Sequence, residues 1–336
     1  MQEPKVGVIV PVYNVERYLP ECLDSLLNQD YRNFVILAIN DGSTDASPQI
    51  LESYQQNHPA NLFVFHKANG GVSSARNLAL TQLKDLACEY ICFADSDDKV
   101  SNQFISDFIE NFRLHQVDYG VCGVSIFGCA GHQRKDSFSE PYRLNNHGDV
   151  ISHFFGTKRW TNRDQTNFRF LSNRCFAYHY IANLSFNECL ITSEDQEFFF
   201  DASEKIEQGI VIPNSNYFYR LRQSSLSHNH LKDLDELNFY IDQLKSKVYR
   251  TDLQTCIYEN AVNCWWLAIN KPTIQQNSTH WDFLDACYQF LKDYNAVKSK
   301  KTLKRFYLYR LLKPLFKLSI LKKKTRSSIS SETFYE

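Results

Sequence analysis

Residues 90–98 have the sequence Tyr-Ile-Cys-Phe-Ala-Asp-Ser-Asp-Asp, a continuous apolar run followed at once by three carboxylates. An apolar run of this kind predicts a strand that is buried on both faces of a sheet. Asp95, Asp97 and Asp98 would then lie together at the carboxyl end of that strand. Two unit charges about 4 Å apart repel by roughly 1 kcal/mol in water and about 4 kcal/mol near a protein surface, so the cluster favours a bound cation.

A divalent metal is the cation that suits these side chains. Carboxylate oxygens favour Mg²⁺ or Mn²⁺, which keep part of their water shell and bind substrate phosphates, whereas Zn²⁺ prefers His and Cys. The alternative interpretation of the same residues is an acidic loop or a helix cap, and Asp98 in particular is placed to cap the helix that follows.

Length and composition predict an ordinary globular protein. The chain has 336 residues, 43% of them hydrophobic, which is enough for two domains or one large one. Its ten cysteines include no Cys-x-x-Cys pair, and we expect reduced thiols in the cytoplasm. The first residues lack a basic stretch followed by a long apolar one, and no run of 18 apolar residues occurs, so neither a signal peptide nor a membrane span is expected.

The net charge of −1 conceals a strongly basic segment. Residues 298–326 hold 12 of the 37 Lys and Arg residues and no acidic residue. Leucine and aromatic residues are interleaved with these cations, which is typical of an amphipathic helix on an anionic membrane surface. We therefore expect peripheral attachment to the cytoplasmic face of a membrane. Nucleic-acid binding is the alternative, and the acidic remainder of the chain disfavours it.

Strands and helices alternate through the first hundred residues. Strands are expected over 6–12, 34–39, 62–66 and 90–94, with helices over 16–29, from about 47, and up to about 83. This order predicts an α/β fold with a doubly wound, mostly parallel sheet flanked by helices. Ligands of such sheets bind beyond the carboxyl ends of the strands, which is where Asp41, the turn at 69–71 and the acidic cluster fall.

The later elements are less regular. We expect a helix over 101–114, a strand over 117–126, a polar loop over 128–150 and a short strand over 210–212. Helical periodicity returns within 231–268 and 281–294, where the tryptophans, Trp265 among them, are expected in the core.

Five blocks of sequence together resemble the family 2 glycosyltransferases of the GT-A fold, including bacterial enzymes that build lipopolysaccharide and capsule saccharides. The blocks are PVYNVERYLPECLDSLLNQDY (11–31), INDGSTDAS (39–47), NGGVSSARN (69–77), YICFADSDD (90–98) and SEDQEF (193–198). The resemblance covers about residues 4–230. It implies inverting, metal-dependent transfer of a hexose or N-acetylhexosamine from a UDP-sugar, with Mn²⁺ or Mg²⁺ on the diphosphate. The implied acceptor is a saccharide, such as a lipid-linked lipooligosaccharide, capsule or O-antigen precursor.

The resemblance also implies roles for residues that bind the donor. Asp97 would hold the metal, Asp95 would contact the metal or the ribose, and Asp41 would accept the uracil N3 proton. A turn or cap residue is the alternative for Asp41, and a surface ion pair is the alternative for Arg76. The nucleotide-sugar site implied in this way comprises Pro11, Val12, Tyr13, Asp41, Arg76, Asp95, Ser96 and Arg222.

On the acceptor side the resemblance implies that Asp195 is the catalytic base and that Glu194 orients the acceptor or the base. The alternative is that both acids stabilise the N-terminus of a helix, which is compatible with the first role. His228 or His230 would complete the metal shell, whereas an isolated surface histidine is the commoner interpretation of each. Arg174 stands where similar enzymes have a K-L-F-R-like block, and the different sequence here puts a carried-over role for it in doubt.

These assignments predict five regions. They are a nucleotide-sugar-binding half (1–120), an acceptor-binding half (121–230), a helical extension (231–297), the basic membrane-surface segment (298–326) and a disordered tail (327–336). Two other function classes compete with a transferase. A sugar-nucleotide pyrophosphorylase would need a Gly-rich phosphate loop after the first strand, where this chain has PVYNVERYL. A non-catalytic saccharide-binding or assembly protein would leave Asp97 and Asp195 without a role.

Overall fold

The computed structural model describes residues 3–128, 134–135, 140–155, 170–190, 193–221, 232–269, 278–294, 301–306 and 309. The chain divides into two compact units, residues 1–225 and 226–336. Each unit has its own core.

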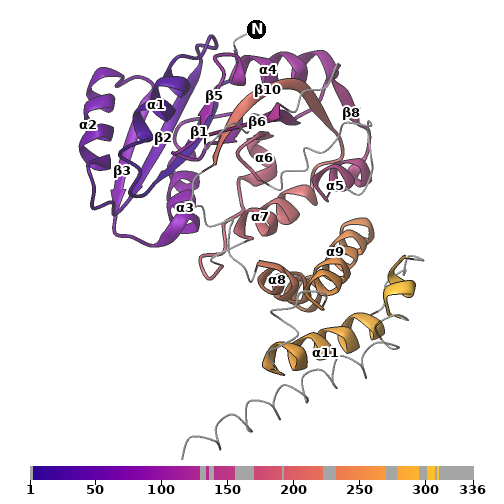
Figure 1. The fold of residues 1–336 in the computed structure, drawn as a ribbon. Helices are drawn as coiled ribbons and strands as arrows, with labels where there is room; N and C mark the ends of the chain where they lie inside the picture. The colour runs from indigo at the N-terminus through magenta and orange to yellow at the C-terminus, as the bar shows by residue number, and fades with distance from the viewer. Residues whose placement is uncertain are drawn as a thin grey trace, which may run out of the picture. The chain divides into compact units, whose positions relative to one another are not determined.

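The first unit is built on one sheet, which contains ten strands among the described residues (Figure 1). Eight strands form a path in the order β3-β2-β1-β4-β9-β6-β10-β5, while β7 pairs with β6 and β8 with β10. Their bounds are β1 Val6–Val12, β2 Phe34–Asp41, β3 Leu62–Lys67, β4 Tyr90–Phe93, β5 Lys99–Val100, β6 Tyr119–Gly128, β7 Arg134–Lys135, β8 Tyr142–Leu144, β9 Arg174–Ala177 and β10 Gly209–Leu221.

The predicted parallel, doubly wound arrangement is confirmed in the first four strands. β1 pairs in parallel with β2 on one side and with β4 on the other, and β2 pairs in parallel with β3. The chain thus runs outward from β1 to β3 and then crosses back to the far side of β1. Connections leave β1 and β4 in opposite directions, so a crevice for ligands is expected at the carboxyl ends of these two strands.

The later elements differ from the sequence-based expectations in three respects. The predicted polar loop at 128–150 contains β8 and the start of α5 (His147–Phe155). β9 was not predicted; it pairs antiparallel with both β4 and β6. β10 extends over Gly209–Leu221 rather than 210–212, because register shifts between Ile212 and Tyr217 accommodate Pro213 and its polar neighbours.

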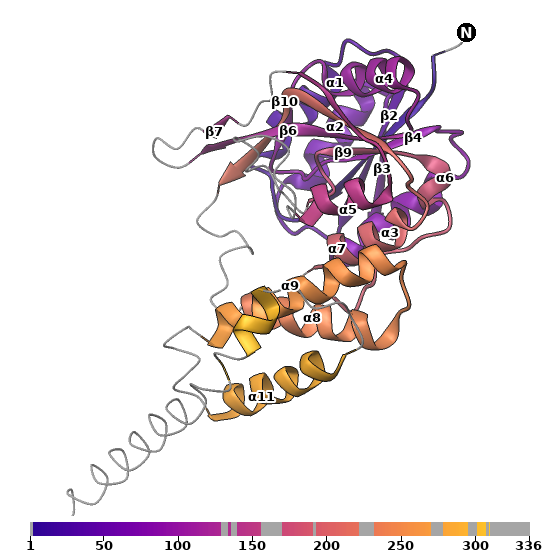
Figure 2. The same cartoon turned by 90° about the vertical axis from the view of Figure 1, so that its right-hand side faces the viewer.

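Helices cover both faces of the sheet (Figures 1 and 2). α1 and α4 pack on one face, where Leu23, Phe104 and Phe108 are fully buried in the core. α3 lies on the other face, close to Gly7, at which an added Cβ would come within 2.8 Å of Leu83. The helices of this unit are α1 Leu19–Leu27, α2 Ser47–Asn57, α3 Gly71–Leu83, α4 Phe104–His115, α5, α6 Tyr178–Ile181 and α7 Glu194–Ser203.

The second unit is helical, with α8 Lys232–Ser246, α9 Thr251–Ile269 and α11 Ser278–Asp293. As predicted, Trp265 is a core residue: it is fully buried, and its ring centroid lies 5.7 Å from that of Phe306 and 4.9 Å from that of Tyr309. Thr302 is also buried and donates a hydrogen bond to Glu259. Thr302, Phe306 and Tyr309 of the basic segment therefore belong to the core of the helical unit, whereas Leu303 between them is 53% exposed. Apart from 301–306 and 309, the rest of 298–326, and all of 327–336, lie outside the described residues.

No helix in the described part of the chain combines the length and the apolar character that crossing a bilayer requires.

Candidate active site

The acidic loop that follows β4 is anchored to β10. Asp98 is 1% exposed, and its carboxylate accepts hydrogen bonds from the Tyr217 hydroxyl at 2.7 Å and from the Arg220 backbone N–H at 2.7 Å. Burial, reinforced by the charges of Asp95 and Asp97, raises the pKa of Asp98 well above its ordinary value. The Tyr217 hydroxyl also accepts the backbone N–H of Asp95 at 3.1 Å. Asp98 thus fixes the path of the loop.

Arg220 holds the same loop with its side chain. Its Nε donates to the Asp97 carbonyl at 2.7 Å, and its Nη2 pairs with Glu21 at 2.5 Å. Sequence reasoning assigned no role to Tyr217 or Arg220, because their partners lie about 120 residues away in the chain. No local pattern reports a contact of that range.

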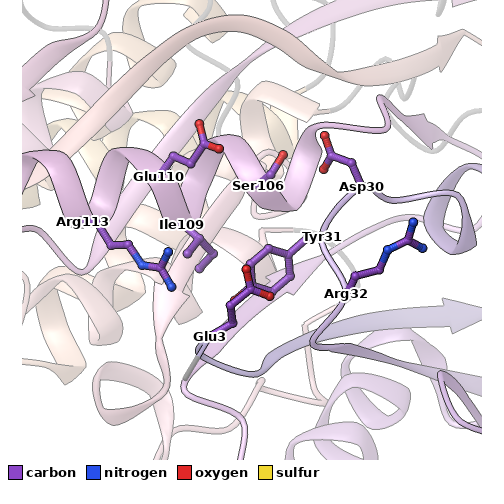
Figure 3. Close-up of a pocket in the computed structure, with 8 residues that line it drawn as sticks. All are labelled: Glu3, Asp30, Tyr31, Arg32, Ser106, Ile109, Glu110 and Arg113. Carbon is purple, nitrogen blue, oxygen red and sulfur yellow. The ribbon is translucent and has the colours of Figure 1, made fainter. Parts of the chain in front are cut away.

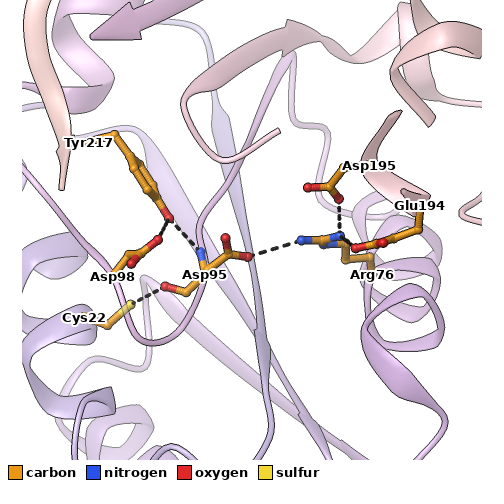
Figure 4. Close-up of polar contacts among 7 residues, drawn as sticks. All are labelled: Cys22, Arg76, Asp95, Asp98, Glu194, Asp195 and Tyr217. Atoms are coloured by element: carbon orange, nitrogen blue, oxygen red, sulfur yellow. Dashed lines mark hydrogen bonds and ion pairs between the residues drawn. The ribbon is translucent and has the colours of Figure 1, made fainter. Parts of the chain in front are cut away.

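Arg76 brings together acids from both halves of the unit (Figure 4). Its guanidinium comes from α3, is almost completely buried, and lies 3.2 Å from Asp95, 3.3 Å from Glu194 and 2.5 Å from Asp195. The alternative of an ion pair at the surface is therefore wrong, because the Arg76 side chain is only 4% exposed. Arg76 occupies the space between the acidic loop and the start of α7.

Three carboxylates share this single cation, and the pKa values of two of them, Glu194 and Asp95, are raised. Burial raises the pKa of Glu194 to about 7, and the neighbouring charge of Asp195 adds to the effect. Desolvation raises the pKa of Asp95 to about 6; Arg76 opposes the shift, while Asp195 and Asp97 add to it. Burial works against the charged form of Arg76, but the surrounding carboxylates outweigh it and hold its pKa above the ordinary value. The site therefore carries excess negative charge, which favours a further cation.

Glu194 and Asp195 are the first two residues of α7. Acids in this position are stabilised by the helix dipole, so the structural alternative holds together with the contact to Arg76. Ser193, immediately before them, has φ 67° and ψ 11°, a left-handed conformation that is uncommon outside glycine. Strained backbone of this kind is concentrated at functional sites, and here it sets the direction in which the acid pair leaves the loop.

Asp41 is committed to the turn that begins α3. Its buried carboxylate accepts hydrogen bonds from Lys67 Nζ at 2.6 Å and from the backbone N–H groups of Gly70 and Gly71 at 2.9 and 2.7 Å. Gly42 has φ +69°, and a Cβ there would lie 2.7 Å from the Asn69 nitrogen, so the two loops approach as only glycine allows. The structure places Asp41 in the alternative role of a turn residue; contact with uracil stays a prediction.

The residues at the end of β1 differ in exposure. Val12 is fully buried, so only its backbone can face a ligand, whereas Tyr13 is 49% exposed and Pro11 is partly exposed. Ser96 is buried within the acidic loop. Arg222 and His228 lie outside the described residues, as does His230.

Arg174 is a core residue on β9. Its guanidinium donates to the Tyr119 hydroxyl and, at 2.8 Å, to the Phe170 carbonyl. It also lies 5.0 Å from the ring centroid of Phe154 and 5.1 Å from that of Phe199. These contacts account for a buried arginine at this position without a role in binding substrate.

The described residues contain no group of three or more His, Cys, Asp or Glu side chains with metal-binding geometry. Mg²⁺ and Mn²⁺ do not require one, because they bind through one or two carboxylates together with water and substrate phosphates. Asp95 and Asp97 follow a strand at the carboxyl edge of the sheet, where the residues supply carboxylate oxygens. The donor set therefore fits a hard divalent cation.

A cavity of about 290 Å³ lies elsewhere, at the amino-terminal edge of β1 and β2 (Figure 3). Both acidic and basic side chains line it: Glu3, Asp30, Arg32, Glu110 and Arg113. The acidic loop and the acid pair are at the opposite edge of the sheet, so this cavity is not part of the candidate site.

Comparison with known proteins agrees with this geometry. The family model described as "Glycosyl transferase family 2" matches residues 7–182. The uncharacterized glycosyltransferase EpsJ of Bacillus subtilis is 34% identical over 229 residues, which cover 67% of this chain and 63% of EpsJ. The chain thus spans slightly less than two thirds of that relative's length.

Two solved structures share the fold. S. aureus TarS (residues 1–349) in complex with UDP-GlcNAc has a TM-score of 0.66 at 21% identity, covering 85% of this chain and 80% of that one. The mannosyltransferase PcManGT of Pyrobaculum calidifontis, in complex with GDP-Man and Mn²⁺, has a TM-score of 0.55 at 15% identity, with coverages of 95% and 84%.

Proposed function

The chain belongs to glycosyl transferase family 2, and from this membership we propose that it moves a hexose or N-acetylhexosamine from a UDP-sugar to a saccharide acceptor with inversion at the anomeric carbon. The fold shared with a protein crystallised with UDP-GlcNAc supports this donor class. The pyrophosphorylase alternative loses its support, because the matching family transfers glycosyl groups, whereas a pyrophosphorylase transfers a nucleotidyl group.

The observation that carries the proposal is the convergence on Arg76. Acids from the donor half and the acceptor half, Asp95 and Asp195, lie within ion-pair distance of one guanidinium. An inverting displacement needs acids from both halves around one sugar, because the base must receive the acceptor proton on the face of the anomeric carbon opposite the diphosphate that leaves. Merely structural acids at a helix start would not need to meet the acidic loop of another strand.

Within this proposal Asp195 takes the proton of the acceptor hydroxyl as that oxygen attacks the anomeric carbon. Glu194, next to it, orients the acceptor hydroxyl or the base. Arg76 holds both acids in place and presents positive charge beside Asp95, where the diphosphate would lie. Tyr13 and the backbone of Pro11 and Val12 border the nucleotide.

Asp95 and Asp97 would hold Mn²⁺ or Mg²⁺. When bound, the ion would neutralise charge on the diphosphate leaving group. The shared fold of a protein crystallised with Mn²⁺ supports a divalent ion, although that likeness alone does not say which one. His228, or His230, as a further ligand remains part of the proposal.

Asp97→Asn provides a test of the metal that does not depend on turnover. The variant should fold normally, since the substitution removes repulsion. Because a carboxylate ligand is lost, the factor by which Mn²⁺ increases the affinity for UDP should be at least about tenfold smaller than in the parent. Calorimetric titration of UDP with and without Mn²⁺ measures this. Asp85→Asn, at an exposed carboxylate after α3, is the matched control and should behave as the parent. An unchanged Mn²⁺ effect in Asp97→Asn would move the metal elsewhere.

We also propose that the acceptor is lipid-linked and that the basic segment attaches the protein to an anionic membrane surface. Residues 310–336 alone contain seven Lys and Arg against two Glu. Each basic residue near an anionic leaflet contributes about 1 kcal/mol, so this stretch suffices for peripheral binding.

Two truncations separate membrane attachment from folding. Deleting 310–336 should leave the described helical unit intact while abolishing sedimentation with phosphatidylglycerol-containing vesicles at low salt. Deleting 298–336 also removes Phe306 and Tyr309 from around Trp265 and the hydrogen bond of Thr302 to Glu259, which should destabilise that unit by at least about 3 kcal/mol. Vesicle sedimentation and urea unfolding measure the two effects. Vesicle binding that survives the shorter deletion, or that ignores salt, would contradict the electrostatic attachment.

A further inference from the structure

We propose that Asn77 is a positioning residue for the acid pair: it fixes the segment on which both Arg76 and the first turn of α7 rest. This inference depends on the proposed function, because it assigns Asn77 an effect on the transfer step. Asn77 follows Arg76 directly on α3, so two adjacent side chains of one helix would control the same acids.

The amide of Asn77 forms a paired contact with the backbone of a single distant residue. Its Nδ2 donates to the Phe186 carbonyl at 2.9 Å, and its Oδ1 accepts the Phe186 N–H at 2.7 Å. Nδ2 also donates to Glu188 Oε1 at 2.9 Å. A carboxamide supplies donors and an acceptor together, which neither a carboxylate nor a hydroxyl can reproduce in the same geometry. The pair of bonds fixes Phe186 in position and in orientation.

Phe186 in turn touches both parts of the acid site. The Arg76 guanidinium lies 5.2 Å from its ring centroid. The same ring also stacks on that of Phe198, with centroids 4.0 Å apart and planes 3° from parallel. Phe198 is three residues after Asp195 on α7, so the two side chains share a helix face. The chain of contacts therefore runs from Asn77 through Phe186 to Arg76 and to the turn that carries Asp195.

A small displacement of Phe186 is passed on through these contacts to the acid pair and is enough to impair transfer. Misplacement of a catalytic group by about 1 Å can cost about 10²-fold in rate even when the mutated residue is remote. Asn77→Ala removes the two bonds that hold Phe186 and leaves every proposed substrate contact in place. We therefore expect kcat for transfer to fall by about 10- to 10²-fold, with the Kd for UDP changed by less than about twofold.

Asn61→Ala is the matched control. Asn61 also donates from Nδ2 to a backbone carbonyl, that of Phe34 at 2.9 Å, but at the amino-terminal ends of β2 and β3. Its kcat should stay within about twofold of the parent. Asn77→Asp serves as a second variant of the positioning residue: it keeps the acceptor and the size, loses the donors and repels Glu188. It should show the same loss if Asn77→Ala does not fold.

A double-mutant cycle with Asp195→Asn separates positioning from a structural role. If Asn77 acts through Asp195, adding Asn77→Ala to Asp195→Asn should lower the remaining transfer rate by less than about threefold. In the parent background the same Asn77→Ala substitution should cause a much larger loss. An equal loss in both backgrounds, or parental kcat in both Asn77 variants, would overturn this inference and leave the proposed function standing. Parental transfer in Asp195→Asn alone would instead overturn the proposed base, and with it the role of Asn77.

Discussion

Asp195→Asn is expected to lower the rate of sugar transfer by at least about 10²-fold, the lower end of what general base catalysis contributes. The acceptor hydroxyl becomes acidic only as its oxygen bonds to the anomeric carbon, so the base acts in the transition state. The loss should therefore appear equally in kcat and in kcat/KM, with little change in the affinity for UDP.

The fold should survive this substitution. Asparagine retains an oxygen that can accept the hydrogen bond from Arg76, and it removes one of three carboxylates that crowd a single guanidinium. Asp201→Asn, later on the same helix, is the control for a general effect of losing an acid from α7 and should transfer at close to the parent rate.

Glu194→Gln tests which of the two acids, Glu194 or Asp195, acts as the base. The raised pKa of Glu194, about 7, means that it too can exchange a proton near neutral pH. Under the proposed roles its replacement should cost less than that of Asp195. A larger loss in Glu194→Gln, with near-parental transfer in Asp195→Asn, would exchange the two roles.

Arg76→Met is expected to destabilise the first unit by about 3–5 kcal/mol near pH 8, the range found when one partner of a buried ion pair is removed. The substitution leaves Asp95, Glu194 and Asp195 facing one another without the cation that now pairs with all three. Arg76→Lys keeps the charge but not the fork of donors, and it should fall between the parent and Arg76→Met.

The destabilisation should shrink as the pH falls. Arg76 is among the causes that hold down the pKa values of Asp95 and Glu194, so its loss should raise both further. A carboxyl whose folded pKa exceeds its unfolded value binds more protons when folded, and stability then declines as pH rises between the two values. Parent and variant share the decline from about 4 in the unfolded chain to about 6 for Asp95 and about 7 for Glu194, so the gap between them should open as the pH rises past the two folded values.

Urea unfolding of parent and Arg76→Met at pH 5.5 and pH 8 measures this difference. The gap in the free energy of unfolding should be clearly larger at pH 8. A gap that is the same at both values would mean that the loss arises from packing against Phe186 rather than from the unpaired carboxylates.

The parallel half of the fold could be predicted because its signals are local. β1 was predicted with its observed bounds, and the apolar run before Asp95 marked a central strand correctly. α1 begins at Leu19 rather than at residue 16, since Pro20 is placed in its first turn, a common start for a helix.

The antiparallel strand β9 and the contacts of the site depend on segments that are distant in the sequence, and no local sequence pattern predicts such contacts. β9 is only four residues long and gains its place from two antiparallel neighbours. The roles of Asp98 and Arg76 depend on Tyr217 and on the acid pair, which lie more than a hundred residues away. The sequence could mark these side chains as chemically interesting, but only the fold shows which of them meet.

The same limit applies to the basic segment. Its charge and its interleaved apolar residues are typical of a membrane-surface helix, and the pattern is identical if some of those apolar residues face a protein core. Phe306 and Tyr309 do face such a core, around Trp265.

The anomeric configuration of the product tests the central claim most directly. The protein would be incubated with Mn²⁺, a panel of α-linked UDP-hexoses and UDP-N-acetylhexosamines, and a set of simple saccharide acceptors, and the new linkage would be assigned by proton NMR. The account predicts transfer from at least one UDP-sugar with a β-linked product, because Asp195 directs attack on the face opposite the leaving UDP. An α-linked product, or no transfer from any UDP-sugar while UDP itself binds, would contradict it.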